Sequence, residues 1–122
     1  MNNGGRMIDN DPATSSSRLE DRWLDLQEWN RRKGELLAVR EGVKLTAMHW
    51  EVIDFLRGYY LRNGLAGSGR DVATALDRAF VSQGGNKYLH RLFPDGPVAQ
   101  GSRIAGLPTP PYTEDTSFGS SL

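Results

Sequence analysis

Apolar residues recur at helical spacing along most of the chain, and the pattern is clearest in the middle. The segment LTAMHWEVIDFLRGYYLRNG spans residues 45–64. Its apolar stripe consists of Val52, Ile53, Leu56, Tyr59 and Tyr60. Because these positions fall on one face at a period of 3.6 residues, the segment predicts an amphipathic helix. Thr46 suits the N-cap of this helix, and Gly64 suits its end.

Shorter helical patterns come before this helix. Leu19, Trp23 and Leu26 fall at i, i+4 and i+7, which predicts a helix. The spacing continues through the apolar positions Trp29, Leu36 and Leu37. Gly34 is a weak point in this stretch, so we expect either one interrupted helix or two short ones.

The region 68–93 predicts two helices joined by a tight glycine turn. Ser68 and Asp71 resemble a capping box for the first helix, and Asn86 is expected to cap the second. The inward-facing side chains expected on the two helices are Val72, Leu76, Phe80, Tyr88, Leu89, Leu92 and Phe93. Pro94 stops the second helix. Beyond it, Pro97 suits the first turn of a last short helix that ends near residue 106.

These elements define a mainly α protein, a small helical bundle that contains a helix-turn-helix-like pair. Met7 and Ile8 indicate a short N-terminal β-hairpin. We expect residues 1–18 to form a flexible N-terminal segment, because Asn, Gly, Ser and Asp favour solvated coil. Residues 19–107 would then form the helical domain, and residues 108–122 a flexible C-terminal arm.

Composition and charge narrow the class of protein. The chain of 122 residues has 15 basic and 15 acidic side chains, so no overall field favours nucleic acid or an anionic membrane. It contains no cysteine, which excludes disulfides and thiol chemistry on these residues. No apolar run approaches the length of a membrane span, and the N-terminus lacks the apolar core of a signal peptide. We therefore expect a cytoplasmic protein.

The polar residues do not form a recognisable catalytic or metal-binding set. His49 and His90 lie far apart without a metal-binding motif, so we expect them to be structural or at the surface. The carboxylates of Glu51, Asp54, Asp71 and Asp77 are expected to be ordinary solvated charges on amphipathic helices. The segment GLAGSGR at 64–70 lacks the Gly-Lys-Ser/Thr ending of a phosphate-binding loop. From these observations we expect no enzyme activity, no metal and no cofactor.

The helix pair offers one candidate site for nucleic acid. Several polar and basic residues would lie at the start and on one face of the second helix, where a helix-turn-helix contacts the major groove. The residues of this candidate site are Asn86, Lys87, His90 and Arg91, with Arg103 nearby in sequence. Against it, the net charge of zero removes the general electrostatic attraction to phosphate.

Two longer stretches resemble the DsrC/TusE family. They are EGVKLTAMHWEVIDFLRGYY at 41–60 and GGNKYLHRLFPDGPVAQGSRIAGLPTP at 84–110, with the motifs LTxxHW, GNxxYLxxLFPxGP and AGLPxP. That family includes the so-called gamma subunit of dissimilatory sulfite reductase and a carrier that passes sulfur toward tRNA thiouridine synthesis. The resemblance implies a small, mostly helical bundle, an N-terminal hairpin in many members and a flexible C-terminal arm.

The resemblance also implies two cysteines that this chain lacks. The family's carriers hold a cysteine near the end of the arm, where it bears persulfide or a trisulfide, and sulfite-reductase-linked members hold a second one just before AGLP. The matching positions here are Thr113 for the first and Ser102 for the second. A hydroxyl does not supply the accessible, polarizable thiolate that a sulfur carrier needs.

We therefore interpret the chain as a non-catalytic member of this family that acts by protein–protein contact, as a regulator or competitor of a true sulfur carrier. Its partners would be sulfite-reductase-like or sulfur-relay complexes. The residues expected to dock on a partner are Ile104, Gly106, Leu107, Pro108 and Pro110. One alternative is a DNA-binding transcriptional regulator. Another is a sulfite reductase gamma-subunit-like or tRNA-thiolation relay protein in the literal family sense.

Overall fold

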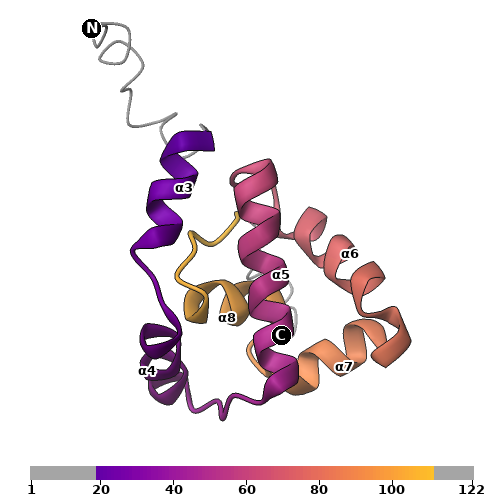
Figure 1. The fold of residues 1–122 in the computed structure, drawn as a ribbon. Coiled ribbons are helices and arrows are strands. Elements are labelled where there is room, and N and C mark those ends of the chain that lie inside the picture. The colour runs from indigo at the N-terminus through magenta and orange to yellow at the C-terminus, as the bar shows by residue number, and fades with distance from the viewer. Residues whose placement is uncertain (1–18, 112–122) are drawn as a thin grey trace, which may run out of the picture.

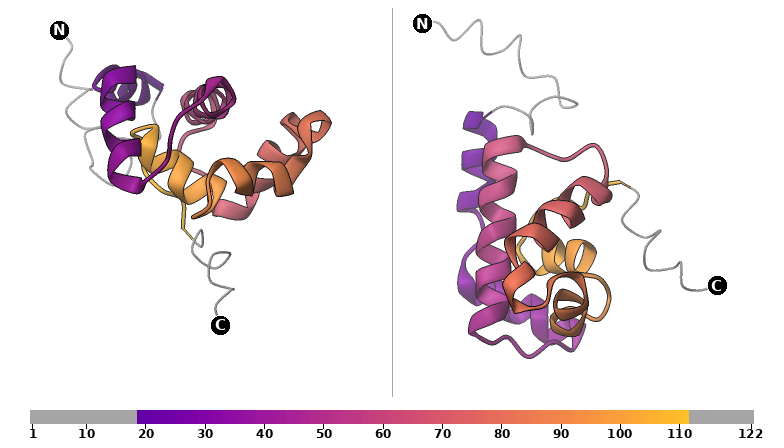
Figure 2. Two further views of the ribbon diagram at one scale, coloured as in Figure 1. Left: turned by 90° about the horizontal axis from the view of Figure 1, so that it is seen from below. Right: turned by 90° about the vertical axis from the view of Figure 1, so that its right-hand side faces the viewer.

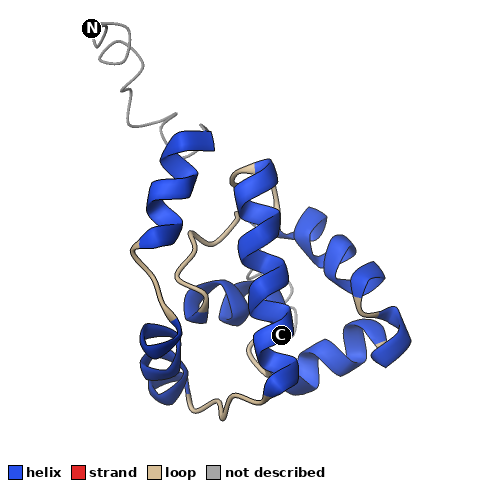
Figure 3. Ribbon diagram, in the orientation of Figure 1, coloured by secondary structure: helices blue, strands red, loops and turns tan. Residues whose placement is uncertain are grey.

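The computed structural model describes residues 19–111, except for the side chain of Asp25. In chain order the helices are α3 (Leu19–Gln27), α4 (Arg31–Glu41), α5 (Ala47–Asn63), α6 (Gly69–Ala79), α7 (Gly85–Leu92) and α8 (Pro97–Ile104). A short 3-10 turn, η1 (Val81–Gln83), joins α6 to α7. Residues 19–111 contain no strand, which confirms the mainly α prediction (Figure 3). The hairpin expected at Met7 and Ile8 lies outside the described residues.

Helix α5 stands at the centre of the molecule. Figure 1 shows α3 and α4 on one side of α5 and the pair α6–α7 on the other. Helix α8 lies behind α5 in that view and between the two flanks, as the view from below in Figure 2 also shows. The last helix is therefore enclosed by earlier parts of the chain.

The apolar stripe predicted for α5 faces the core. Val52, Ile53 and Leu56 are almost completely buried, and Tyr60 continues the same face. The other helices contribute Leu76, Leu89, Phe93, Val98 and Ile104 to this core. Fully burying an aliphatic or aromatic side chain contributes about 1.5–3 kcal/mol to the free energy of folding. This cluster is therefore the main hydrophobic contribution to the stability of the described domain.

The break between α3 and α4 falls before Gly34 rather than at it. Asn30 ends the interruption, because its side chain accepts a hydrogen bond from the Lys33 backbone N–H at 2.9 Å and so caps α4. Gly34 is buried inside α4, where a Cβ would lie 2.6 Å from Cζ2 of Trp29. The glycine is therefore a packing site for the Trp29 ring.

Helix α3 buries only part of its apolar side chains. Leu19 and Trp23 are 60% and 53% exposed, whereas Leu26 is buried. Arg22 is also buried, with its Nε donating to the Leu61 carbonyl at 2.9 Å. The long arginine side chain can lie on the domain while its charged end bonds to a carbonyl in the last turn of α5, and periodicity alone does not reveal this.

Buried His49 has a structural role at the start of α5. Its Nδ1 accepts a hydrogen bond from the Thr46 backbone N–H at 3.0 Å, and its Nε2 lies 2.8 Å from the Leu92 carbonyl. Since a backbone N–H only donates, Nδ1 is the acceptor and the ring hydrogen sits on Nε2. The histidine completes the capping box of α5 and ties that helix to the end of α7.

Both N-termini of the helix pair differ from expectation. Ser68 stands at the N-cap position of α6 but forms no side-chain cap hydrogen bond, so the Ser68–Asp71 capping box is absent. Asn86 lies inside α7, because the glycine turn with positive φ angles already starts that helix. The carboxylate of Asp77 on α6 accepts from the Asn86 backbone N–H at 2.7 Å and takes the capping role. None of the helices in residues 19–111 is both long and apolar enough to cross a membrane.

Candidate functional site: a buried serine and the segment that covers it

Ser102 lies on the buried face of α8 and is 3% exposed. Gly101 allows this burial, because a Cβ there would come within 2.8 Å of Cδ1 of Leu56 on α5. The absence of that atom lets the two helices approach closely. Ser102 therefore occupies a position inside the fold.

A small pocket borders Ser102, with a cavity volume of about 20 Å³. A pocket of this size is large enough to admit a water molecule. One wall comes from α5 and the loop after it, and the other from residues 107–111, which we call the C-terminal segment. The pocket is lined by Leu56, Tyr59, Tyr60, Gly64, Leu65, Ala66, Val72, Ser102, Leu107, Pro108 and Pro110. The C-terminal segment thus covers the serine.

The C-terminal segment leaves α8 through a defined turn. The Leu107 N–H donates to the Ser102 carbonyl at 2.9 Å, and the Gly106 N–H donates to the Arg103 carbonyl at 3.2 Å. With Gly106 in the left-handed region at φ 72°, these two bonds form a Schellman motif. The turn sends the chain back across its own helix.

Two side chains from the other half of the chain satisfy the next carbonyls of α8. The Trp29 indole Nε1–H donates to the Ile104 carbonyl at 2.9 Å. Nη1 of Arg57 donates to the Ala105 carbonyl at 2.8 Å, and its guanidinium lies 4.0 Å from the centre of the Trp29 ring. The last carbonyls of a helix have no partner inside the helix, so these bonds fix where the C-terminal segment begins.

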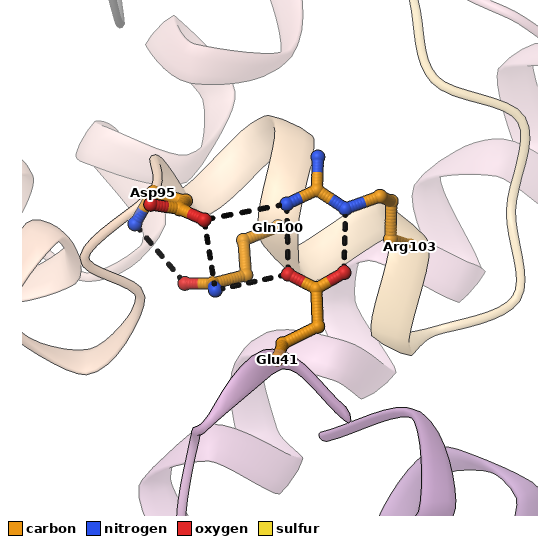
Figure 4. Close-up of polar contacts among 4 residues, drawn as sticks. All are labelled: Glu41, Asp95, Gln100 and Arg103. Carbon is orange, nitrogen blue, oxygen red and sulfur yellow. Dashed lines mark hydrogen bonds and ion pairs between the residues drawn. The ribbon is translucent and has the colours of Figure 1, made fainter. Parts of the chain in front are cut away.

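A polar network joins α8 to the end of α4 (Figure 4). Glu41 accepts two hydrogen bonds from Arg103, 2.7 Å from Nε and 2.8 Å from Nη2. Gln100 is buried and donates to Glu41 at 3.1 Å, while its carbonyl oxygen accepts from the Asp95 N–H at 3.1 Å. The hydrogen bonds from Arg103 hold the pKa of Glu41 below its usual range, against the opposing effect of burial. Arg103, placed by sequence in the nucleic-acid site, is thus bonded to Glu41.

The expected docking residues do not share one environment. Ile104 is completely buried in the core, so its side chain is not offered to a partner. Gly106 and Pro108 are exposed, Leu107 is half-buried and Pro110 is buried. The buried Pro110 shows that contact with the domain continues beyond residue 107, where the sequence placed the end of the helical domain. Thr113 lies outside the described residues.

Four of the residues proposed to contact nucleic acid lie together on α7. Asn86, Lys87, His90 and Arg91 are all exposed. Nδ1 of His90 lies 3.0 Å from the Asn86 carbonyl, and Arg91 lies 6.0 Å from the Tyr88 ring centre. Within residues 19–111 no group of three or more metal-ligating side chains comes together.

Comparison with known proteins identifies the class. The model of the family described as DsrC like protein matches residues 14–112. The chain is 42% identical to sulfurtransferase TusE of Sodalis glossinidius over 86 residues, 70% of this chain and 80% of that protein. It is 36% identical to sulfurtransferase TusE of Yersinia pseudotuberculosis over 107 residues, 87% of this chain and 93% of that protein.

A solved structure agrees with these matches. The NMR structure of Allochromatium vinosum DsrC superposes with a TM-score of 0.60 at 37% sequence identity, covering 70% of this chain and 77% of that one. The chain belongs to the DsrC-like protein family.

The family assignment corrects one expectation. The sequence led us to expect a chain that is not an enzyme, because no catalytic set was visible. Relatives that cover most of this chain carry the name sulfurtransferase, which contradicts that expectation. The expectation was wrong because it rested on a search for a nucleophile with a base, and a sulfurtransferase name does not require such a pair to be visible in the sequence.

Sequence reasoning missed the residues that position the C-terminal segment. Trp29 was assigned only to a helical stripe, and Arg57 and Glu41 were not selected. Their partners are backbone carbonyls or residues about 50 or more positions away. The position of Trp29 directly before the Asn30 cap could have indicated a distant contact, because a large aromatic side chain in a helix break needs another surface to cover it.

Proposed function

We propose that this chain acts in a sulfur-relay system by occupying the docking place of a cysteine-bearing DsrC-like carrier, and so regulates or competes with that carrier. The observation that carries the proposal is Ser102, which is buried on an otherwise family-like scaffold at the position where the resemblance expects a cysteine. Any sulfur handled in the complex is held by a thiol of another protein, since the chain has no cysteine.

The docking surface is the exposed part of the turn and of the C-terminal segment. Gly106, Pro108 and Thr109 are exposed there, next to half-buried Leu107. Proline restricts the backbone before binding, so such a segment loses little conformational entropy when a partner holds it. The partners are sulfite-reductase-like or sulfur-relay complexes, which recognise the same segment on a true carrier.

A binding competition tests this proposal. A fluorescently labelled, cysteine-bearing family member is bound to its purified sulfur donor, and the unlabelled chain is titrated in. We expect displacement of the labelled carrier. Pro108→Asp should weaken displacement, whereas Thr74→Asp, an exposed change on α6, should leave it intact. A chain that never displaces the carrier contradicts the proposal.

A second candidate function is DNA binding by α7. It is favoured by the joint exposure of Lys87 and Arg91, which are four residues apart and so share a face of the helix. Duplex binding would weaken steeply with added salt and would be lost in the Lys87→Ala, Arg91→Ala double variant. If fluorescence anisotropy detects no duplex binding at low salt, this candidate is excluded.

A further inference from the structure

Helix α6 begins without a side-chain cap. The backbone of Ser68 is extended, with φ −155° and ψ 158°, but its side chain forms no capping hydrogen bond. The first N–H groups of a helix have no partner inside the helix and need an outside acceptor. Here the acceptor for Gly69 is the carbonyl of Pro111, at 2.7 Å. The C-terminal segment therefore caps α6.

Packing of the segment holds this acceptor in place. Pro110, directly before it, is buried and lines the same pocket as Leu65 and Val72. At the other end of the segment, Gly106 is fixed by the Schellman turn and by the Trp29 ring, with which a Cβ at Gly106 would overlap. The segment is thus attached at its start and touches α6 at its end.

The neighbouring helix is capped in a different way. The Asn86 N–H of α7 donates to Oδ1 of Asp77 at 2.7 Å, the same distance as the Gly69 bond. Asp77 belongs to α6, so this second cap is made within the helix pair. Helices α6 and α7 thus both begin with a capping bond of 2.7 Å, and within residues 19–111 the bond at α6 comes from the C-terminal segment whereas the bond at α7 does not.

We propose that residues 107–111 form a strap that controls the first turn of α6. When the strap is lifted from the domain, the Gly69 N–H loses its acceptor and the first turn of α6 opens, while α7 keeps its Asp77 cap. Binding of a partner that pulls the strap away from the domain would therefore loosen the first turn of α6. This inference goes beyond the competition proposed above and does not depend on it, because it concerns contacts within one chain.

Amide hydrogen exchange measured by NMR tests the strap. In the full-length chain, Pro110→Asp lifts the segment by placing a charge in its buried position. We expect the exchange rate of the Gly69 amide to rise by about tenfold, the loss of one net hydrogen bond, with the Asn86 amide unchanged. Asp77→Ala should give the opposite pattern: the exchange rate of the Asn86 amide should rise, and that of the Gly69 amide should stay unchanged.

A chain that ends at Thr109 is the second variant, since it removes the Pro111 carbonyl whatever the effect of the aspartate. Faster exchange confined to the Gly69 amide and the first turn of α6 supports the strap. Unchanged exchange at Gly69 in this truncated chain overturns it. An equal rise at Gly69 and Asn86 also overturns it, because that pattern means general destabilisation of the fold.

Discussion

The indole Nε1–H of Trp29 donates to the carbonyl oxygen of Ile104 at 2.9 Å, although the two residues are 75 positions apart. This bond joins the break between α3 and α4 to the end of α8. The direction of the C-terminal segment therefore depends on the N-terminal part of the domain.

Trp29→Phe tests the contribution of that bond to stability. Phenylalanine keeps most of the ring but leaves the Ile104 carbonyl without its donor, which should cost about 1–3 kcal/mol of unfolding free energy. Trp23→Phe is the matched control, because Trp23 is 53% exposed and its substitution should change stability by less than about 0.5 kcal/mol. Urea unfolding of both variants measures the difference, and equal effects would contradict the role of Trp29.

Gly106→Ala should be more harmful than an alanine at another left-handed glycine. Gly42 has φ 76° and no neighbouring atom within 4 Å of a built Cβ, so Gly42→Ala reports the backbone cost alone, about 1–2 kcal/mol. At Gly106, with φ 72°, the added Cβ also overlaps the Trp29 ring. We expect thermal unfolding to show the larger loss for Gly106→Ala. Equal losses would mean that the ring moves aside freely.

The Glu41–Arg103 pair predicts a pH dependence of stability. The folded-state pKa of Glu41 lies below its ordinary value of 4.5, so the carboxylate contributes stability that is fully present above pH 4.5. That contribution is lost as the pH falls through the lower folded-state value. The effect is reduced by solvent, because the Arg103 side chain is 42% exposed.

Denaturant unfolding at a series of pH values measures this effect. Glu41→Gln should be less stable than the parent at neutral pH and should lose less stability on acidification. Glu35→Gln, at an exposed position of α4, is the control and should keep the parent pH dependence. If Glu41→Gln loses as much stability on acidification as the parent, the pair does not act as described.

The Ser102→Cys variant should fold with its thiol buried. The pocket of about 20 Å³ beside Ser102 gives room for the larger sulfur atom, so we expect a stability change under about 1.5 kcal/mol. The thiol should react slowly with a disulfide reagent, compared with Thr109→Cys at an exposed position. Adding Pro110→Asp should speed the reaction at position 102. Equal reactivity of the two single variants would contradict the burial of Ser102.

The sequence predicted those parts of the fold that depend on local pattern. The stripe on α5, the short helix that begins at Pro97 and the inward side of α7 were all expected from helical spacing and Pro or Gly boundaries. Such features are set by residues a few positions apart. For these elements the helical period was enough to indicate the side that faces the core, whereas for α3 it was not.

The parts that were missed are tertiary partners. Ser68 was expected to cap α6 and Asn86 to cap α7, but a distant carbonyl and the Asp77 side chain do so. Arg22 was not expected to be buried, because the acceptor that makes this possible belongs to α5. In each case the hydrogen-bond partner is supplied by another element, and its position is known only after the chain has folded.

The most direct test of the account is the rate at which sulfur is loaded onto a cysteine-bearing DsrC-like carrier by its donor, followed by intact mass spectrometry. With this chain added in increasing amounts, loading of the carrier should slow, and the mass of this chain should stay unchanged. Pro108→Asp should relieve the inhibition. An unaffected loading rate, or a sulfur adduct on this chain itself, would contradict the proposal that it acts by occupying the carrier's place.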